Sequence, residues 1–166
     1  MAKYETNLPR AALGLVVGTV AGASLIELWF LSELRDLQEL HLALQAASAI
    51  FIYAAFFWAA GLFLVAPLPW ALLHHCGMRS WLSALALGAA LTFGVMLAGE
   101  TYWFGLRAPG DLSAADLAGR TTWTDGQLTL HGWANAVGHA LLFSIIGTLV
   151  GLVVWRTAYR RITSTG

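Results

Sequence analysis

The chain has 166 residues, of which 58% are hydrophobic and only 11% are charged. Typical soluble domains are about 45–50% apolar and about 25% charged, so a soluble fold of this size would lack the polar residues to cover its surface. The formal net charge is zero, which gives no indication of a nucleic-acid partner, and the single cysteine, Cys76, excludes an intramolecular disulfide.

Four apolar stretches follow one another along the chain, and each is long enough to cross a hydrocarbon core of about 30 Å as a helix. Backbone polar groups find no water in lipid, which favours helices, and the stretches lack the alternation of barrel strands. The predicted fold is an all-α integral membrane domain, residues 1–166, with four transmembrane helices. The predicted spans are Ala11–Leu31, Ala43–Ala66, Trp81–Leu106 and Leu130–Trp155.

The first stretch also resembles a secretory signal peptide. Lys3 and Arg10 precede an apolar core, and Ala21-Gly-Ala23 resembles a small-residue cleavage site. Apolar residues continue past that site to Leu31, however, so we favour an uncleaved helix.

The connections between the spans differ in character. Residues 32–42 form an amphipathic pattern that predicts a helical extension or a surface helix. Pro67 and Pro69 are expected to end the second helix in a turn. In the loop 107–129, Ser113 and Asp116 resemble a short helix cap, and residues 121–130 predict a β-hairpin around Asp125-Gly126.

The distribution of basic residues predicts the orientation. Three of them lie on one side of the predicted spans, at Arg35, Arg107 and Arg120. Six lie on the other side, at Lys3, Arg10, Arg79, Arg156, Arg160 and Arg161. The positive-inside rule places the six in the cytoplasm, so both termini are predicted to be cytoplasmic and the hairpin to lie outside. The short loops and compact size favour a bacterial inner membrane.

Polar residues within the predicted spans gather toward the outer side and form a candidate pocket. They are Glu27, His41, Gln45, Glu100, Asn135 and His139. Ionisable residues inside a span indicate a functional site by default. Three chemistries fit: a divalent metal bound by His131, His139 and Glu100, proton transfer between Glu100 and His139, and a haem held by His41 and a span-four histidine. The alternative, which we favour, is that these groups are interfacial or hydrogen-bond between helices.

Glycines recur at every fourth residue in two spans and predict close helix packing. They are Gly14, Gly18 and Gly22 in the first span, and Gly147 and Gly151 in the fourth. Packing inside the bundle is the simpler interpretation, and an interface with a second protein is the alternative. The span-three series Ala90, Gly94 and Ala98 follows the same pattern.

No phosphate-binding loop, nucleophile elbow or redox Cys-x-x-Cys occurs in the sequence. The sequence therefore favours a non-enzymatic membrane subunit that packs against itself or another membrane protein. A membrane enzyme or transporter that handles a metal, a proton or another ligand in the outward-facing pocket is the alternative.

Overall fold

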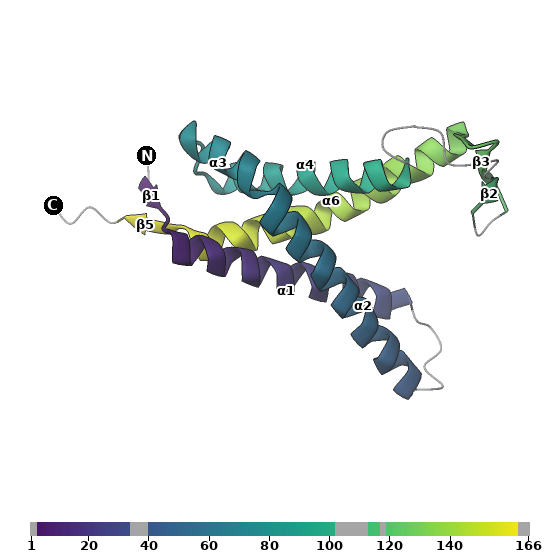
Figure 1. Ribbon diagram of the computed structural model, residues 1–166, viewed down its shortest axis with the longest axis horizontal. Coiled ribbons are helices and arrows are strands. Elements are labelled where there is room, and N and C mark those ends of the chain that lie inside the picture. Colours follow the sequence, from purple (N-terminus) through teal and green to yellow (C-terminus); the bar gives the residue numbers. More distant parts are fainter. Residues whose placement is uncertain (1–2, 34–39, 102–112, 117–118, 163–166) are drawn as a thin grey trace. The chain divides into compact units, whose positions relative to one another are not determined.

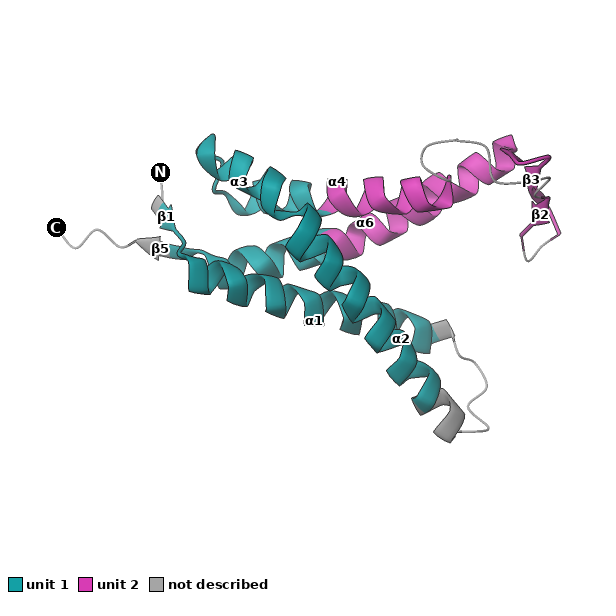
Figure 2. Ribbon diagram, in the orientation of Figure 1, with its two compact units in different colours: residues 1–88, 148–166 teal, residues 89–147 magenta. Residues whose placement is uncertain are grey.

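The computed structural model describes residues 3–33, 40–101, 113–116 and 119–162, and it is mostly helical (Figure 1). Four helices in this described part have the length and hydropathy of membrane spans, as predicted: Leu8–Ser32, Gln45–Val65, Trp81–Glu100 and Leu130–Ala158. The chain divides into two compact units, residues 1–88 with 148–166 (unit 1) and residues 89–147 (unit 2), shown in Figure 2.

Three of the four span helices begin at recognisable caps. In α1 (Leu8–Glu33), the Asn7 side chain accepts a hydrogen bond from the Arg10 backbone N–H, and Pro9 occupies the first turn. The hydroxyl of Ser80 caps α4 (Trp81–Glu100), and that of Thr129 caps α6 (Leu130–Ala158). These caps place the helix starts within three residues of the predicted spans.

The prediction that Pro67 and Pro69 end the second helix in a turn is wrong. The helix α2 (Leu40–Ala60) passes into a π-helical turn, η1 (Gly61–Val65), and then into α3 (Pro67–His75). The N–H of Ala66 bonds to the carbonyl of Gly61, and Pro67 stands in the first turn of α3, where its missing N–H costs no hydrogen bond. The two prolines therefore begin a new helix.

Unit 1 is packed around the glycines of α1. A Cβ on Gly18 would lie 2.5 Å from Cγ2 of Val154, and one on Gly22 would lie 2.5 Å from the Trp58 ring. Gly14 approaches the Val154 carbonyl, at 3.0 Å from its would-be Cβ. The glycines of the first span thus contact side chains and backbone of α2, η1 and α6 of the same chain.

The two ends of the described chain meet in a short antiparallel sheet. Strand β1 (Lys3–Glu5) pairs with β5 (Arg160–Ile162), with Tyr4 opposite Arg161 and Glu5 opposite Arg160. Beside it, the Tyr4 ring lies edge-on to Trp155. Because β1 precedes α1 and β5 follows α6, these two helix ends lie together.

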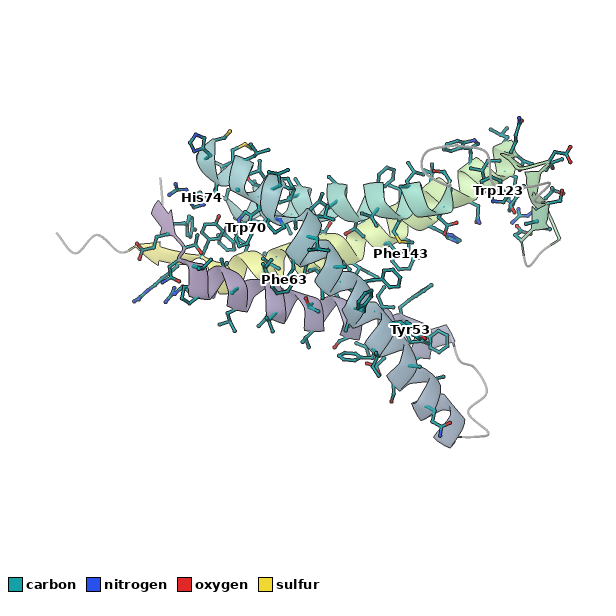
Figure 3. All side chains as sticks on the ribbon, in the orientation of Figure 1. Tyr53, Phe63, Trp70, His74, Trp123 and Phe143 are labelled. Atoms are coloured by element: carbon teal, nitrogen blue, oxygen red, sulfur yellow. The ribbon has the colours of Figure 1, made fainter. Side chains whose placement is uncertain are left out.

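A buried tyrosine joins α3 to the end of α6. Trp70 and His74 extend from α3 (Figure 3). The indole N–H of Trp70 donates to the Tyr159 hydroxyl at 2.9 Å, and His74 Nδ1 lies 3.0 Å from the same oxygen. Burial, and then the charge of Arg79, lower the pKa of His74, so the neutral ring accepts the Tyr159 O–H.

Tyr159→Phe should lower the stability of unit 1 by about 1–3 kcal/mol, because it removes a buried hydroxyl and leaves the part-buried Trp70 N–H without its acceptor. Tyr53→Phe, at a tyrosine that is 68% exposed, is the matched control and should have little effect. The pKa of His74 in the folded protein lies below its usual 6.5. The contribution of the His74–Tyr159 hydrogen bond to stability is therefore complete above pH 6.5 and is lost as the pH falls through the folded pKa. Denaturation in detergent at several pH values measures both effects, and equal losses in the two variants would contradict the network.

In unit 2, a three-stranded sheet precedes α6, in the order β2 (Ala114–Ala115), β3 (Thr121–Thr124), β4 (Gln127–Leu128). β3 and β4 pair around Asp125 and Gly126, which both have positive φ, as the Asp-Gly signal predicts. The predicted helix cap at Ser113 is wrong, because the next two residues form β2. Gly132, in the first turn of α6, lies directly against the Thr122 carbonyl, so this sheet packs on its own helix.

Candidate functional site

The two units divide the predicted pocket residues between them. Glu27 and Gln45 lie in unit 1, whereas Glu100, Asn135 and His139 lie in unit 2. Glu27 is partly buried on α1, and Gln45 is exposed on α2. His41 belongs to α2, but its side chain lies outside the described residues. A single pocket made by all six, and a haem between His41 and span four, therefore stay predictions.

Within unit 2, α4 and α6 bring Glu100 and His139 together. Oε1 of Glu100 lies 3.2 Å from Nδ1 of His139, across 39 residues of sequence. Both side chains remain open, at 36% exposed for Glu100 and 48% for His139. Glu100 is the last residue of its span, and His139 lies more than two turns inside its own. A carboxylate and an imidazole thus form an exposed polar pair on helices that are otherwise strongly apolar.

The pair can share a proton, and it can bind a further polar group. If Nδ1 of His139 carries a proton, it donates to Glu100, and a proton can be shared between the two groups. Nε2 of His139 and Oε2 of Glu100 bond to no other described residue, so each is available to a side chain, a water molecule or a ligand.

Open glycines adjoin both members of the pair. No described atom lies within 4 Å of a Cβ built on Gly99 or on Gly138, which directly precede Glu100 and His139. A second backbone can therefore approach closely beside each polar residue, as it does at small-residue helix interfaces.

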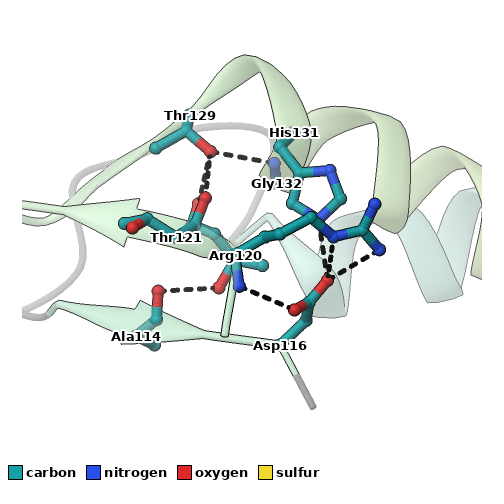
Figure 4. Close-up of polar contacts among 8 residues, drawn as sticks. Ala114, Asp116, Arg120, Thr121, Thr129, His131 and Gly132 are labelled. Atoms are coloured by element: carbon teal, nitrogen blue, oxygen red, sulfur yellow. Dashed lines mark hydrogen bonds and ion pairs between the residues drawn. The ribbon is translucent and has the colours of Figure 1, made fainter. Parts of the chain in front are cut away.

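His131, the third residue of the predicted metal site, has a different partner. Its Nε2 lies 2.8 Å from Oδ2 of Asp116, which precedes β3 (Figure 4). The described residues contain no group of three or more His, Cys, Asp or Glu side chains that could hold a metal ion. The structure thus brings Glu100 to His139 and His131 to Asp116, and it does not bring the three predicted ligands together.

Asp116 is the residue whose role the sequence did not indicate, because the sequence assigns it only to a helix cap with Ser113. Its carboxylate accepts the Arg120 backbone N–H at 2.9 Å and the Arg120 Nε–H at 3.0 Å, in addition to His131 (Figure 4). The Arg120 backbone N–H and then the His131 ring lower the pKa of Asp116 to about 2. The spacing of Asp116 and Arg120 is a further sequence signal, and it indicates a local ion pair rather than a contact with α6.

Asp116→Asn should loosen the sheet from α6, because the amide replaces a charged acceptor of three hydrogen bonds. In the wild type, the contribution of Asp116 should be present above pH 3.8 and lost as the pH falls toward 2. Amide exchange at Arg120, followed by NMR, measures both effects. Asp125→Asn is the matched control, since asparagine suits the positive φ of that turn. Similar exchange in the two variants would contradict the role of Asp116.

No family model matches the chain, and no curated protein or solved structure matches it either.

Proposed function

We propose that this chain is a non-enzymatic subunit of a membrane assembly, which packs against a second copy or another membrane protein through the surface around Glu100 and His139. The bacterial inner membrane, with both termini in the cytoplasm, is the proposed location. The excess of six basic residues over three on the predicted cytoplasmic side supports that orientation.

The observation that supports this proposal most is the exposure of the Glu100–His139 pair. Apolar side chains exposed on a span need no explanation, because lipid covers them. His139 lies more than two turns inside its span, where an exposed polar group meets hydrocarbon at a cost in free energy, so such groups normally face protein or a water-filled cavity. A partner helix that bonds to Nε2 of His139 or Oε2 of Glu100 removes this cost, and the open Gly99 and Gly138 let its backbone approach.

Photo-crosslinking from two adjacent leucines of α6 tests this proposal. Leu142 is 44% exposed and follows His139 by three residues, so it lies on the same side of the helix. Leu141 is 56% exposed but follows His139 by two residues, which places it on the nearly opposite side. A crosslinking residue at position 142 should capture protein in native membranes, and one at position 141 should capture mainly lipid. Equal yields of protein adducts, or lipid adducts alone at 142, would contradict the proposed interface.

Proton handling by the same pair is the second candidate, and the hydrogen bond between the carboxylate and the imidazole favours it. Glu100→Gln separates the two functions, because glutamine keeps the size and the hydrogen bonding but cannot take up a proton. A packing subunit should retain most of its assembly with this substitution. A proton-handling protein should lose proton movement, measured with a pH-sensitive dye in proteoliposomes, while its assembly stays intact.

A further inference from the structure

The end of unit 1 at which β1 pairs with β5 concentrates positive charge. Arg156 and Arg160 are exposed, Arg10 lies in the first turn of α1, and Arg79 directly precedes the cap of α4. Lys3 and Arg161 add two basic positions to the paired strands, in which Glu5 is the one acidic residue. This surface therefore suits an anionic partner.

A cluster of aromatic rings contacts Arg79 at the same end through Trp155. The indole N–H of Trp155 donates to the Arg79 carbonyl at 3.1 Å, and the Trp155 ring stacks with Tyr159 and meets Tyr4 edge-on. Tryptophan and tyrosine concentrate at the depth of lipid headgroups, at the ends of membrane spans. The cations and the rings thus occupy the ends of α1, α4 and α6, where headgroups are expected.

Arg79 also carries an unsatisfied donor. Its Nε is buried and has no hydrogen-bond partner among the described residues, which is the single such side-chain atom found in that part of the chain. A buried guanidinium N–H without an acceptor is costly, and phosphate oxygens match the guanidinium fork in geometry and charge. This donor is evidence for a ligand that is independent of the charge count.

We propose that this end of unit 1 binds the phosphate of an anionic phospholipid headgroup, with Arg79 as its main contact and with Arg156 and Arg160 supplying further charge. A phospholipid fits better than a soluble anion because the cluster lies at the ends of spans and among interfacial aromatic rings. The proposed lipid site lies in unit 1 and the proposed packing interface lies in unit 2. An experiment can therefore contradict one of the two proposals without contradicting the other.

Native mass spectrometry of the full chain in detergent, titrated with phosphatidylglycerol or with phosphatidylcholine of the same acyl chains, tests this inference. Phosphatidylglycerol should bind more tightly than phosphatidylcholine, and added salt should weaken the binding of phosphatidylglycerol. Arg79→Gln should lower the affinity for phosphatidylglycerol by about fivefold. The double variant Arg156→Gln/Arg160→Gln should lower it by about fivefold for each of the two charges removed. The double variant changes only exposed residues, so it decides the matter if Arg79→Gln does not fold.

Arg120→Gln is the matched control, because Arg120 is an exposed cation of unit 2 that pairs with Asp116. It should leave lipid binding unchanged. Equal affinity for the two lipids, or an equal loss in the Arg120 variant, would overturn the proposal. Displacement of phosphatidylglycerol by inorganic phosphate alone would overturn the assignment to a lipid.

Discussion

Gly151→Ala should lower the free energy of unfolding by about 1–3 kcal/mol, the usual cost of overpacking a well-filled core. A Cβ at Gly151 would overlap the backbone carbonyl of Ala84 and would lie 3.4 Å from Cα of Gly88. Backbone atoms of α4 cannot turn aside as a flexible side chain can, so one of the two helices must shift.

The matched control for that substitution is Gly94→Ala on α4. No described atom lies within 4 Å of a Cβ at Gly94, so the added methyl group meets no obstacle. Alanine forms helices better than glycine, by up to about 1 kcal/mol, and the control should be neutral or stabilising. Unfolding by denaturant in mixed micelles gives both values, and equal stability of the two variants would contradict the packing of α6 on α4 in unit 1.

Replacing both Glu100 and His139 by leucine should leave the monomer folded and should weaken its assembly by about 5- to 30-fold. Hydrogen bonds within membranes contribute on average about 0.6 kcal/mol and at most about 1.7 kcal/mol each, so two such contacts amount to about 1–2 kcal/mol. Leucine has no polar atom that could bond to a partner, and it is favourable in contact with lipid.

Energy transfer between labelled copies, or between the chain and its co-purifying partner, measures this loss in liposomes. Gln45→Leu is the control, since Gln45 is an exposed polar residue of a span in unit 1. An undiminished assembly in the double variant would rule out the pair as a contact. An equal loss in the Gln45 variant would show that any polar residue of a span has this effect.

Local signals in the sequence were sufficient for much of the fold. Hydropathy marked the four spans, because a helix that crosses lipid must be apolar over its whole length. Asp125-Gly126 marked the turn between β3 and β4, because few other residues adopt its backbone conformation. The spacing of Gly14, Gly18 and Gly22 marked a helix surface, although only the structure shows that Val154 and Trp58 occupy it.

The failures have physical reasons as well. Proline is compatible with both the end and the start of a helix, and Pro67 alone does not distinguish them. Trp70 and Tyr159 are separated by 89 residues, and no local pattern indicates that they meet. The sequence marked Glu100, His131 and His139 as unusual, but it could not show that His131 belongs with Asp116, since that pairing depends on the sheet of unit 2.

The most direct test of the proposed function is the mass of the assembly released from native membranes into lipid nanodiscs, without detergent extraction. A packing subunit should appear as a multiple of its 17.8 kDa chain or within a heavier complex. Substitution of Glu100 and His139 by leucine should shift that population toward the single chain. A single 17.8 kDa chain in the wild type, at its natural abundance, would contradict the proposal.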